Sequence, residues 1–216
     1  MIRAVTEQAL IGLRHQCLKA LCLCAVLFFY SSSAQSGGIL NGYATSLSLI
    51  DNGEWIYMTE GAEATLVGCS GACPRNLIIP DRVDGIRVTA IGDSAFEGVV
   101  LDDVAFTNNL ISIGSYAFRR TELKFVSFPS ALESIGYQAF SENRLRSVTL
   151  GESVKDIRAE AFSYQLERAL KHLDLGRVRT VARYAFAGNE LTRLVLPDSL
   201  TNLNEYAFAD NTLTSV

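Results

Sequence analysis

A phenylalanine recurs along this chain at intervals of 22 to 24 residues, always directly after an alanine. An aliphatic side chain stands five residues before each phenylalanine. The phenylalanines are Phe96, Phe118, Phe140, Phe162, Phe186 and Phe208, and the aliphatic residues are Ile91, Ile113, Ile135, Ile157, Val181 and Leu203. A near-constant interval of this length is typical of a solenoid, in which equivalent small units stack in a line. We therefore predict that the six rings form a column through a continuous core.

A second pattern, Leu-x-x-Val-x-Leu or a close variant, lies between successive phenylalanines, as at Leu145, Val148 and Leu150. Its alternation predicts a short strand with one buried face. Ile135 and Ala139 are four residues apart, which predicts a brief helical or 3-10 stretch before each phenylalanine. Each coil is thus expected to contain a strand, a turn and a short helical stretch. Coils stacked at about 4.8 Å would join their strands into a parallel sheet.

Asparagine recurs two residues before the first leucine of this pattern, at Asn143, Asn189 and Asn211. An asparagine side chain can bond backbone groups at a tight turn, and stacked copies can form a ladder. We interpret these residues as structural and not catalytic.

Residues 35–75 precede the repeats and are expected to form a loose leader followed by an N-terminal cap. Residues 55–58 and 64–67 have strand character, and the stretch between them is a turn signal. We predict a small β-hairpin that covers the exposed apolar end of the first coil, because solenoids need such caps. The repeats occupy residues 76–216 in about six units, and the last unit stops in mid-strand.

The unit formed by Ile135, Gly136, Ala139, Phe140, Asn143, Leu145, Val148 and Leu150 resembles the BspA-like leucine-rich repeats of bacterial and protist surface proteins. The resemblance covers residues 76–216. It implies a right-handed α/β solenoid with a parallel sheet on the concave face and short helical or 3-10 turns opposite. It also implies an exported interaction protein, since some members of the family act as adhesins, but it names no ligand.

The sequence departs from that pattern where Gly92, Gly114 and Gly136 give way to other residues in the later repeats. A left-handed backbone is therefore not expected at this position in every coil.

The first 34 residues have the features of a signal peptide. Residues 20–30 (ALCLCAVLFFY) are apolar and uncharged, and they are too few to span a bilayer as a helix. Arg14 and Lys19 supply a positive flank, and Ala34 ends a plausible cleavage site. We expect a secreted, periplasmic or cell-surface protein without a membrane span in the mature chain; an uncleaved anchor is the alternative.

Two of the five cysteines, Cys69 and Cys73, lie beyond this segment. An even pair in an exported chain indicates a structural disulfide. A metal site or a redox pair are the alternatives. A metal needs more ligands, and the mature chain has a single histidine, His172. We expect no metal.

The net charge of −4 leaves −6 for the chain after Ala34, because the first 34 residues carry +2. A mildly acidic body does not favour binding to nucleic acid, which requires many phosphate contacts. The sequence contains no glycine-rich phosphate loop, no nucleophile motif and no converging titratable group. We therefore expect neither a cofactor nor an enzymatic activity.

The outward positions of the predicted strands are the candidate ligand contacts. One row would contain Asp103, Phe125, Ser147, His172, Arg193 and Ser215, and the next Ala105, Ser127, Thr149, Asp174 and Val195. Both rows mix charges and sizes, so an unspecialised solvated face is an equal alternative. Arg177, Arg179 and Arg183 cluster after the fourth strand. We interpret this cluster as a solvated edge, with anion binding as the alternative.

These patterns predict an exported protein that binds a protein or cell-surface ligand, with adhesion as one form of that role. The alternatives are a passive envelope protein and a fragment of a longer repeat array without activity of its own; an enzyme is disfavoured. The chain stops after the first residues of a repeat strand. An open sheet end of this kind predicts a longer parent array or self-association through the uncapped coil.

Overall fold

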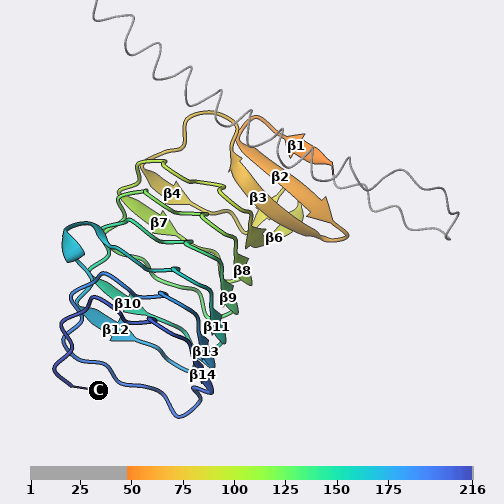
Figure 1. Cartoon of the computed structure of the whole chain (residues 1–216). Helices are drawn as coiled ribbons and strands as arrows, with labels where there is room; N and C mark the ends of the chain where they lie inside the picture. The colour runs from red at the N-terminus through yellow and green to blue at the C-terminus, as the bar shows by residue number, and fades with distance from the viewer. Residues whose placement is uncertain (1–47, 216) are drawn as a thin grey trace, which may run out of the picture. The chain divides into compact units, whose positions relative to one another are not determined.

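A computed structural model describes residues 48–215 as a stack of coils (Figure 1). The predicted signal peptide, the leader as far as Leu47 and the terminal Val216 lie outside the described residues. The parallel solenoid that the repeats predict is confirmed.

One long ladder of strands runs along one side of the coils (Figure 1). From β3 onward its neighbours pair in parallel, and each strand from β8 on carries an aliphatic residue that stands five positions before a phenylalanine. The strands are, in order, β1 (Leu49–Asp51), β2 (Trp55–Glu60), β3 (Glu63–Cys69), β6 (Ile86–Ile91), β8 (Ser112–Ile113), β9 (Ser134–Ile135), β11 (Asp156–Ile157), β13 (Thr180–Val181) and β14 (Asn202–Leu203). A short strand, β5 (Arg82–Val83), pairs antiparallel with β6.

The Leu-x-x-Val-x-Leu segments lie on the other side of the coils (Figure 1). They pair in parallel as β4 (Asn76–Ile78) with β7 (Asp103–Ala105), and as β10 (Ser147–Thr149) with β12 (His172–Asp174). The segment around Phe125 is not a strand, so the expectation that these segments form one unbroken sheet is wrong. The N–H groups of Phe125, Val126 and Ser127 form no backbone hydrogen bond within residues 48–215, so this segment has no ladder with the next coil.

The expected helical stretch before each phenylalanine is also absent from residues 48–215, where these stretches are turns. The N–H of Phe140 donates to the carbonyl oxygen of Ala161 in the next coil, at 2.8 Å, and not to a residue four positions earlier. The one short helix of the described chain is η1 (Leu166–Arg168), in the repeat with the two-residue insertion.

Each of these turns contains two residues with left-handed backbone. They stand two positions before and two positions after each phenylalanine, with φ between 50° and 69°. The first set is Ser94, Tyr116, Gln138, Glu160, Tyr184 and Tyr206; the second is Gly98, Arg120, Glu142, Tyr164, Gly188 and Asp210. The earlier glycines Gly92, Gly114 and Gly136 are not among the residues with positive φ.

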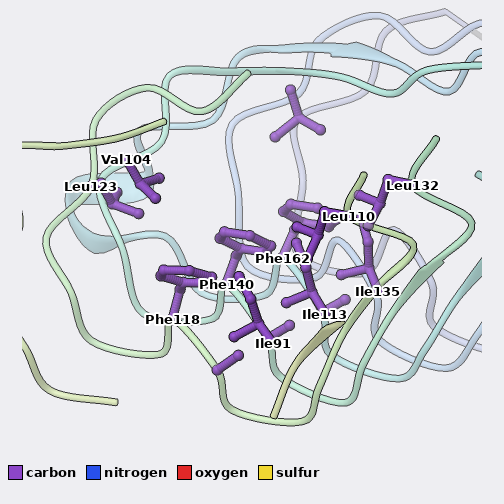
Figure 2. Packing of buried hydrophobic residues seen from close by; sticks show 14 of the residues in the cluster. Ile91, Val104, Leu110, Ile113, Phe118, Leu123, Leu132, Ile135, Phe140 and Phe162 are labelled. Atoms are coloured by element: carbon purple, nitrogen blue, oxygen red, sulfur yellow. The ribbon is translucent and has the colours of Figure 1, made fainter. Parts of the chain in front are cut away.

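The six phenylalanines form one column in the core, and neighbouring ring centroids are 5.2 to 5.4 Å apart. Five rings are fully buried, while Phe208 is partly buried. Ile91, Ile113 and Ile135 form a second column beside the rings (Figure 2). Close packing of a column that repeats in every coil explains why the same side chains recur in the sequence.

The N-terminal strands form the predicted hairpin. β2 and β3 pair antiparallel across the turn at Gly61, and β3 then pairs in parallel with β6, which continues the ladder into the first coil. Trp55 and Tyr57 are buried in this hairpin. Cys69 and Cys73 are joined by a disulfide, with Cα atoms 5.5 Å apart.

Candidate interaction surface

We call the outward side of the Leu-x-x-Val-x-Leu segments the strand face. In one such segment Leu145, Val148 and Leu150 are buried, so Arg146, Ser147 and Thr149 point outward. Repetition in each coil creates three rows. The first is Asp102, Lys124, Arg146, Lys171 and Thr192; the second is Asp103, Phe125, Ser147, His172, Arg193 and Ser215; the third is Ala105, Ser127, Thr149, Asp174 and Val195.

The predicted contact residues lie along the second row on successive coils. Ser147 is the register partner of His172, and Arg193 bridges to Ser215 in the next coil. Asp103 pairs with Asn76 on the N-terminal side. Asp103, His172 and Arg193 are exposed, whereas Ser147 is half-buried.

Phe125 is the large apolar side chain of this row, in its second coil, and 57% of it is exposed. Phe106 and Phe128, which end this segment in two neighbouring coils, instead pack edge-on against the core column. Phe106 contacts Phe118 and Phe128 contacts Phe140. An exposed aromatic residue therefore interrupts an otherwise polar row.

The first row contains a feature that sequence reasoning missed. Lys124, Arg146 and Lys171 occupy equivalent places in three consecutive coils, since Arg146 N–H donates to Lys124 O and Lys171 N–H donates to Arg146 O. The signal was present in the sequence, because a basic residue directly follows the first leucine in three successive repeats.

Most of this positive charge is not neutralised by ion pairs. Lys171 Nζ lies 3.4 Å from Glu190 Oε2. Lys124, Arg146 and Arg193 form no ion pair within residues 48–215, and all three are exposed. The strand face thus carries free cations in the coil of Phe125 and in later coils.

Charge is also distributed unevenly along the coils. Residues 48–118 contain ten acidic and three basic side chains, whereas residues 119–215 contain twelve acidic and thirteen basic ones. On the strand face the change falls between Asp102 and Asp103 in one coil and Lys124 in the next.

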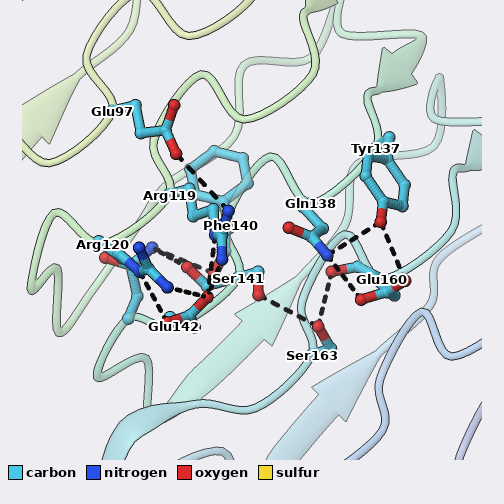
Figure 3. A network of polar contacts seen from close by, with 11 residues as sticks. Glu97, Arg119, Arg120, Tyr137, Gln138, Phe140, Ser141, Glu142, Glu160 and Ser163 are labelled. Carbon is cyan, nitrogen blue, oxygen red and sulfur yellow. Dashed lines mark hydrogen bonds and ion pairs between the residues drawn. The ribbon is translucent and has the colours of Figure 1, made fainter. Parts of the chain in front are cut away.

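A polar network joins neighbouring coils at the turns near the phenylalanines (Figure 3). Arg119 and Arg120 both bind the carboxylate of Glu142. Partial burial acts to raise the pKa of Glu142, but hydrogen bonds from Arg120 and Arg119 outweigh it and hold the pKa below its ordinary value. These charged groups form ion pairs with one another across two coils, so the network is structural.

Tyr137 belongs to the same set of turn contacts (Figure 3). Its hydroxyl donates to Glu160 Oε1 at 3.1 Å, and Gln138 Nε2 donates to the other oxygen of that carboxylate at 2.6 Å. Burial and the hydrogen bond to Glu160 raise the pKa of Tyr137 to about 12. A tyrosine held neutral in this way is not prepared for acid–base chemistry near neutral pH.

The arginines at residues 177, 179 and 183 have different surroundings. Arg177 Nε lies 3.8 Å from Glu152 Oε2. The Arg183 guanidinium lies 4.9 Å from the ring centroid of Tyr184 and 5.5 Å from that of Tyr206. Arg179 is exposed next to β13.

Within the part of the chain that the structure describes, no three His, Cys, Asp or Glu side chains gather as metal ligands would. A search of the same residues also finds no helix with the length and apolarity needed to cross a bilayer.

Comparison with known proteins identifies the repeat. Residues 88–215 match the model of the BspA-type leucine-rich repeat region in six copies. No curated protein matches the sequence.

Solved structures with the same fold come from several bacteria, at identities that show the fold alone. A leucine-rich cell surface protein from Faecalibacterium prausnitzii is 22% identical, with a TM-score of 0.58 over 80% of this chain and 56% of that one. A leucine-rich repeat protein from Bacteroides ovatus is 24% identical, with a TM-score of 0.59 over 78% of this chain and 52% of that one. The pneumococcal vaccine antigen PcpA is 22% identical, with a TM-score of 0.59 over 76% of this chain and 48% of that one.

The chain spans about half the length of these solved structures. The family model, in contrast, covers more than half of this chain, and the matched range contains all six phenylalanines of the column. The chain therefore belongs to the BspA-type leucine-rich repeat family.

Proposed function

We propose that this chain is a binding protein that recognises another protein through the strand face, with Phe125 at the centre of the contact. The observation that carries the proposal is the exposure of Phe125 in a row of polar residues on the stack of coils. Burying the exposed part of its ring against a partner would contribute about 1–2 kcal/mol. Aromatic residues surrounded by polar ones are common anchors of protein interfaces.

The structure offers a surface for contact more readily than a site for chemistry. The strand face is built from the same three outward positions in successive coils, so it presents a wide area, with an open hollow beside Arg193, Val195 and Ser215. The charged groups at the turns, such as Glu142, are held by neighbouring coils. Solenoids commonly use such extended faces for recognition. We therefore do not propose an enzymatic role.

Export and surface display extend this proposal. The apolar segment of residues 20–30 and the Cys69–Cys73 disulfide favour a chain that leaves the reducing cytosol. A similar solved structure is a leucine-rich cell surface protein. On a cell surface, a protein-binding face would act in adhesion.

Fractionation of the native cells tests export independently of binding. A western blot should find the chain outside the cytosol with an N-terminus near Gln35, determined by mass spectrometry, and with Cys69 and Cys73 oxidised. A full-length chain in the envelope would indicate the uncleaved anchor. An unprocessed, reduced chain in the cytosol would contradict export.

Binding is tested on an array of purified extracellular proteins with the fluorescently labelled mature chain. We expect saturable binding that weakens about tenfold or more in Phe125→Ala and more moderately in Arg193→Ala. Ile111→Ala is the matched control, because Ile111 is an exposed apolar side chain just before β8, on the other ladder. The proposal fails if the array shows no saturable partner, or if Ile111→Ala weakens binding as much as Phe125→Ala.

A passive envelope protein is the second candidate. The small side chains of the third row, including Ala105, Ser127 and Thr149, favour it because they offer little contact area. In that case the chain would be retained in the envelope fraction, and no array partner would show saturable binding.

A further inference from the structure

We infer that the protein segment recognised by the strand face is acidic: a short extended stretch that places two or three carboxylates beside one apolar side chain. This inference rests on the proposed function. It concerns which kind of partner the strand face fits.

The cations of the first row have the spacing of an extended peptide. Lys124, Arg146 and Lys171 lie in consecutive coils, which are separated by about 4.8 Å, so the three side chains span about 10 Å. An extended chain covers that distance in about three residues. Arg193 adds a free cation in the second row, two coils after Ser147.

Carboxylates lie before the positive area and within it. Asp102 and Asp103 lie in the coil before Lys124, and Asp174 lies in the third row beside His172. These carboxylates would repel a polyanion long enough to run along the whole face. A short acidic segment can bind beside Lys124 and Arg146 without reaching these carboxylates, whereas a long sulfated or phosphorylated polymer would meet them.

The exposed ring of Phe125 adds an apolar requirement. Phe125 follows Lys124 directly, so its ring and the ammonium group emerge from the same short segment. A partner that carries both carboxylates and an apolar side chain would satisfy the two groups together. Protein segments combine these chemistries, while an anionic sugar polymer supplies only the charge.

Recognition would depend on side chains and not on strand addition. The N–H of Arg146 is already bound to the carbonyl oxygen of Lys124, and the N–H of Lys171 to that of Arg146. These backbone groups of the first row therefore already bind the neighbouring coils and do not pair with an added strand. The hydroxyls of Ser147, Ser127 and Thr149 remain as hydrogen-bond donors beside the cations.

The test uses fluorescence anisotropy with three labelled probes. The first is an eight-residue peptide with three glutamates around one leucine; the second replaces the glutamates with glutamines; the third is a sulfated hexasaccharide. We expect the acidic peptide to bind at least tenfold more tightly than the other two probes. Its affinity should fall severalfold between 50 and 300 mM salt, because exposed charges are screened.

Charge reversal on the protein locates the site. Lys124→Glu with Arg146→Glu should weaken the acidic peptide about tenfold or more. The matched control reverses Lys155 and Arg179, which are also exposed, also lie in neighbouring coils and form no ion pair within residues 48–215. This second pair flanks β11 and β13 on the other ladder, so reversing it should leave the affinity within a factor of two.

Several outcomes overturn the inference. Tighter binding of the hexasaccharide would assign the face to an anionic glycan. Equal losses in both charge-reversed pairs would show a non-specific charge effect. If the array partner depends on Phe125 but tolerates Lys124→Glu with Arg146→Glu, the acidic inference fails while the proposed function stands. If Phe125→Ala also has no effect, both fail.

Discussion

Asn143 Nδ2 donates a hydrogen bond of 2.7 Å to the carbonyl oxygen of Phe118, which belongs to the preceding coil. The same amide nitrogen lies 3.1 Å from the carbonyl oxygen of Phe140 in its own coil. Its oxygen accepts the N–H groups of Thr121 and Leu123 at 3.0 and 3.2 Å. One buried side chain therefore satisfies backbone groups of two coils at once.

Removing this amide should destabilise the stack strongly. Asn143→Ala leaves buried donors and acceptors of both coils without partners, and we expect a loss of about 2–4 kcal/mol in the free energy of unfolding, measured by urea denaturation. Arg146→Ala, three residues away and exposed, should change it by less than about 0.5 kcal/mol. A change in Asn143→Ala as small as in this control would show that the amide is dispensable.

The phenylalanine column should behave differently from Phe125, although the residue type is the same. Phe140 is fully buried and stacks 5.3 Å from Phe118 and 5.4 Å from Phe162. Phe140→Ala should cost about 3–5 kcal/mol of folding free energy, because it removes apolar contact and leaves a cavity. Phe125→Ala should cost less than about 1 kcal/mol while it weakens partner binding. Equal losses of stability would contradict the assignment of Phe125 to the surface.

Repetition explains why so much of the core could be predicted from the sequence. The column positions recur because each coil packs on its neighbours with the same geometry, so six independent copies report one environment. Gln165 shows that this reasoning fails where the residue type changes although the contact is kept. It replaces asparagine in the ladder, yet its Nε2 donates to Phe140 O at 2.8 Å and its Oε1 accepts the N–H of Leu145 at 3.0 Å.

The turns could not be predicted in the same way, because no residue type marks them. Left-handed backbone usually favours glycine, but Tyr116, Gln138 and Glu160 adopt it here. The backbone bonds that hold these turns are made with the next coil, as where the N–H of Phe140 donates to the carbonyl oxygen of Ala161, and a single repeat contains no sign of them. The basic row differs from the turns, because its signal was present in the sequence. Lys124 and Arg146 each directly follow the first leucine of their repeat.

Gly136 should be intolerant of a side chain for reasons of space and not of conformation. A Cβ atom there would lie 2.5 Å from the carbonyl carbon of Gly114 in the preceding coil. Gly136→Ala should force the coils apart and cost about 1–3 kcal/mol in urea denaturation. Gly71→Ala is the control, since nothing lies within 4 Å of that Cβ position and φ is not positive there. A neutral Gly136→Ala would show that the coils can separate freely.

Tyr137 should make the fold sensitive to alkaline pH. Its pKa is raised to about 12 by burial and by the hydrogen bond to Glu160, whereas an unfolded tyrosine titrates near 10. Between these values the folded state retains a proton that the unfolded state releases, so stability is present below pH 10 and falls as pH rises toward 12. Near pH 11 the loss should be about 1 kcal/mol relative to pH 9.

Urea unfolding of Tyr137→Phe at pH 9 and pH 11 isolates this contribution. The variant loses the hydroxyl hydrogen bond at both pH values, so only the difference between the two pH values reports the titration. That difference should be smaller than in the wild type by about 1 kcal/mol. Glu160→Gln should reduce the difference only in part, because burial is the larger cause of the raised pKa. If all three proteins lose the same stability between pH 9 and pH 11, Tyr137 does not hold its proton in the folded chain, and the coil contact through Glu160 is open to water.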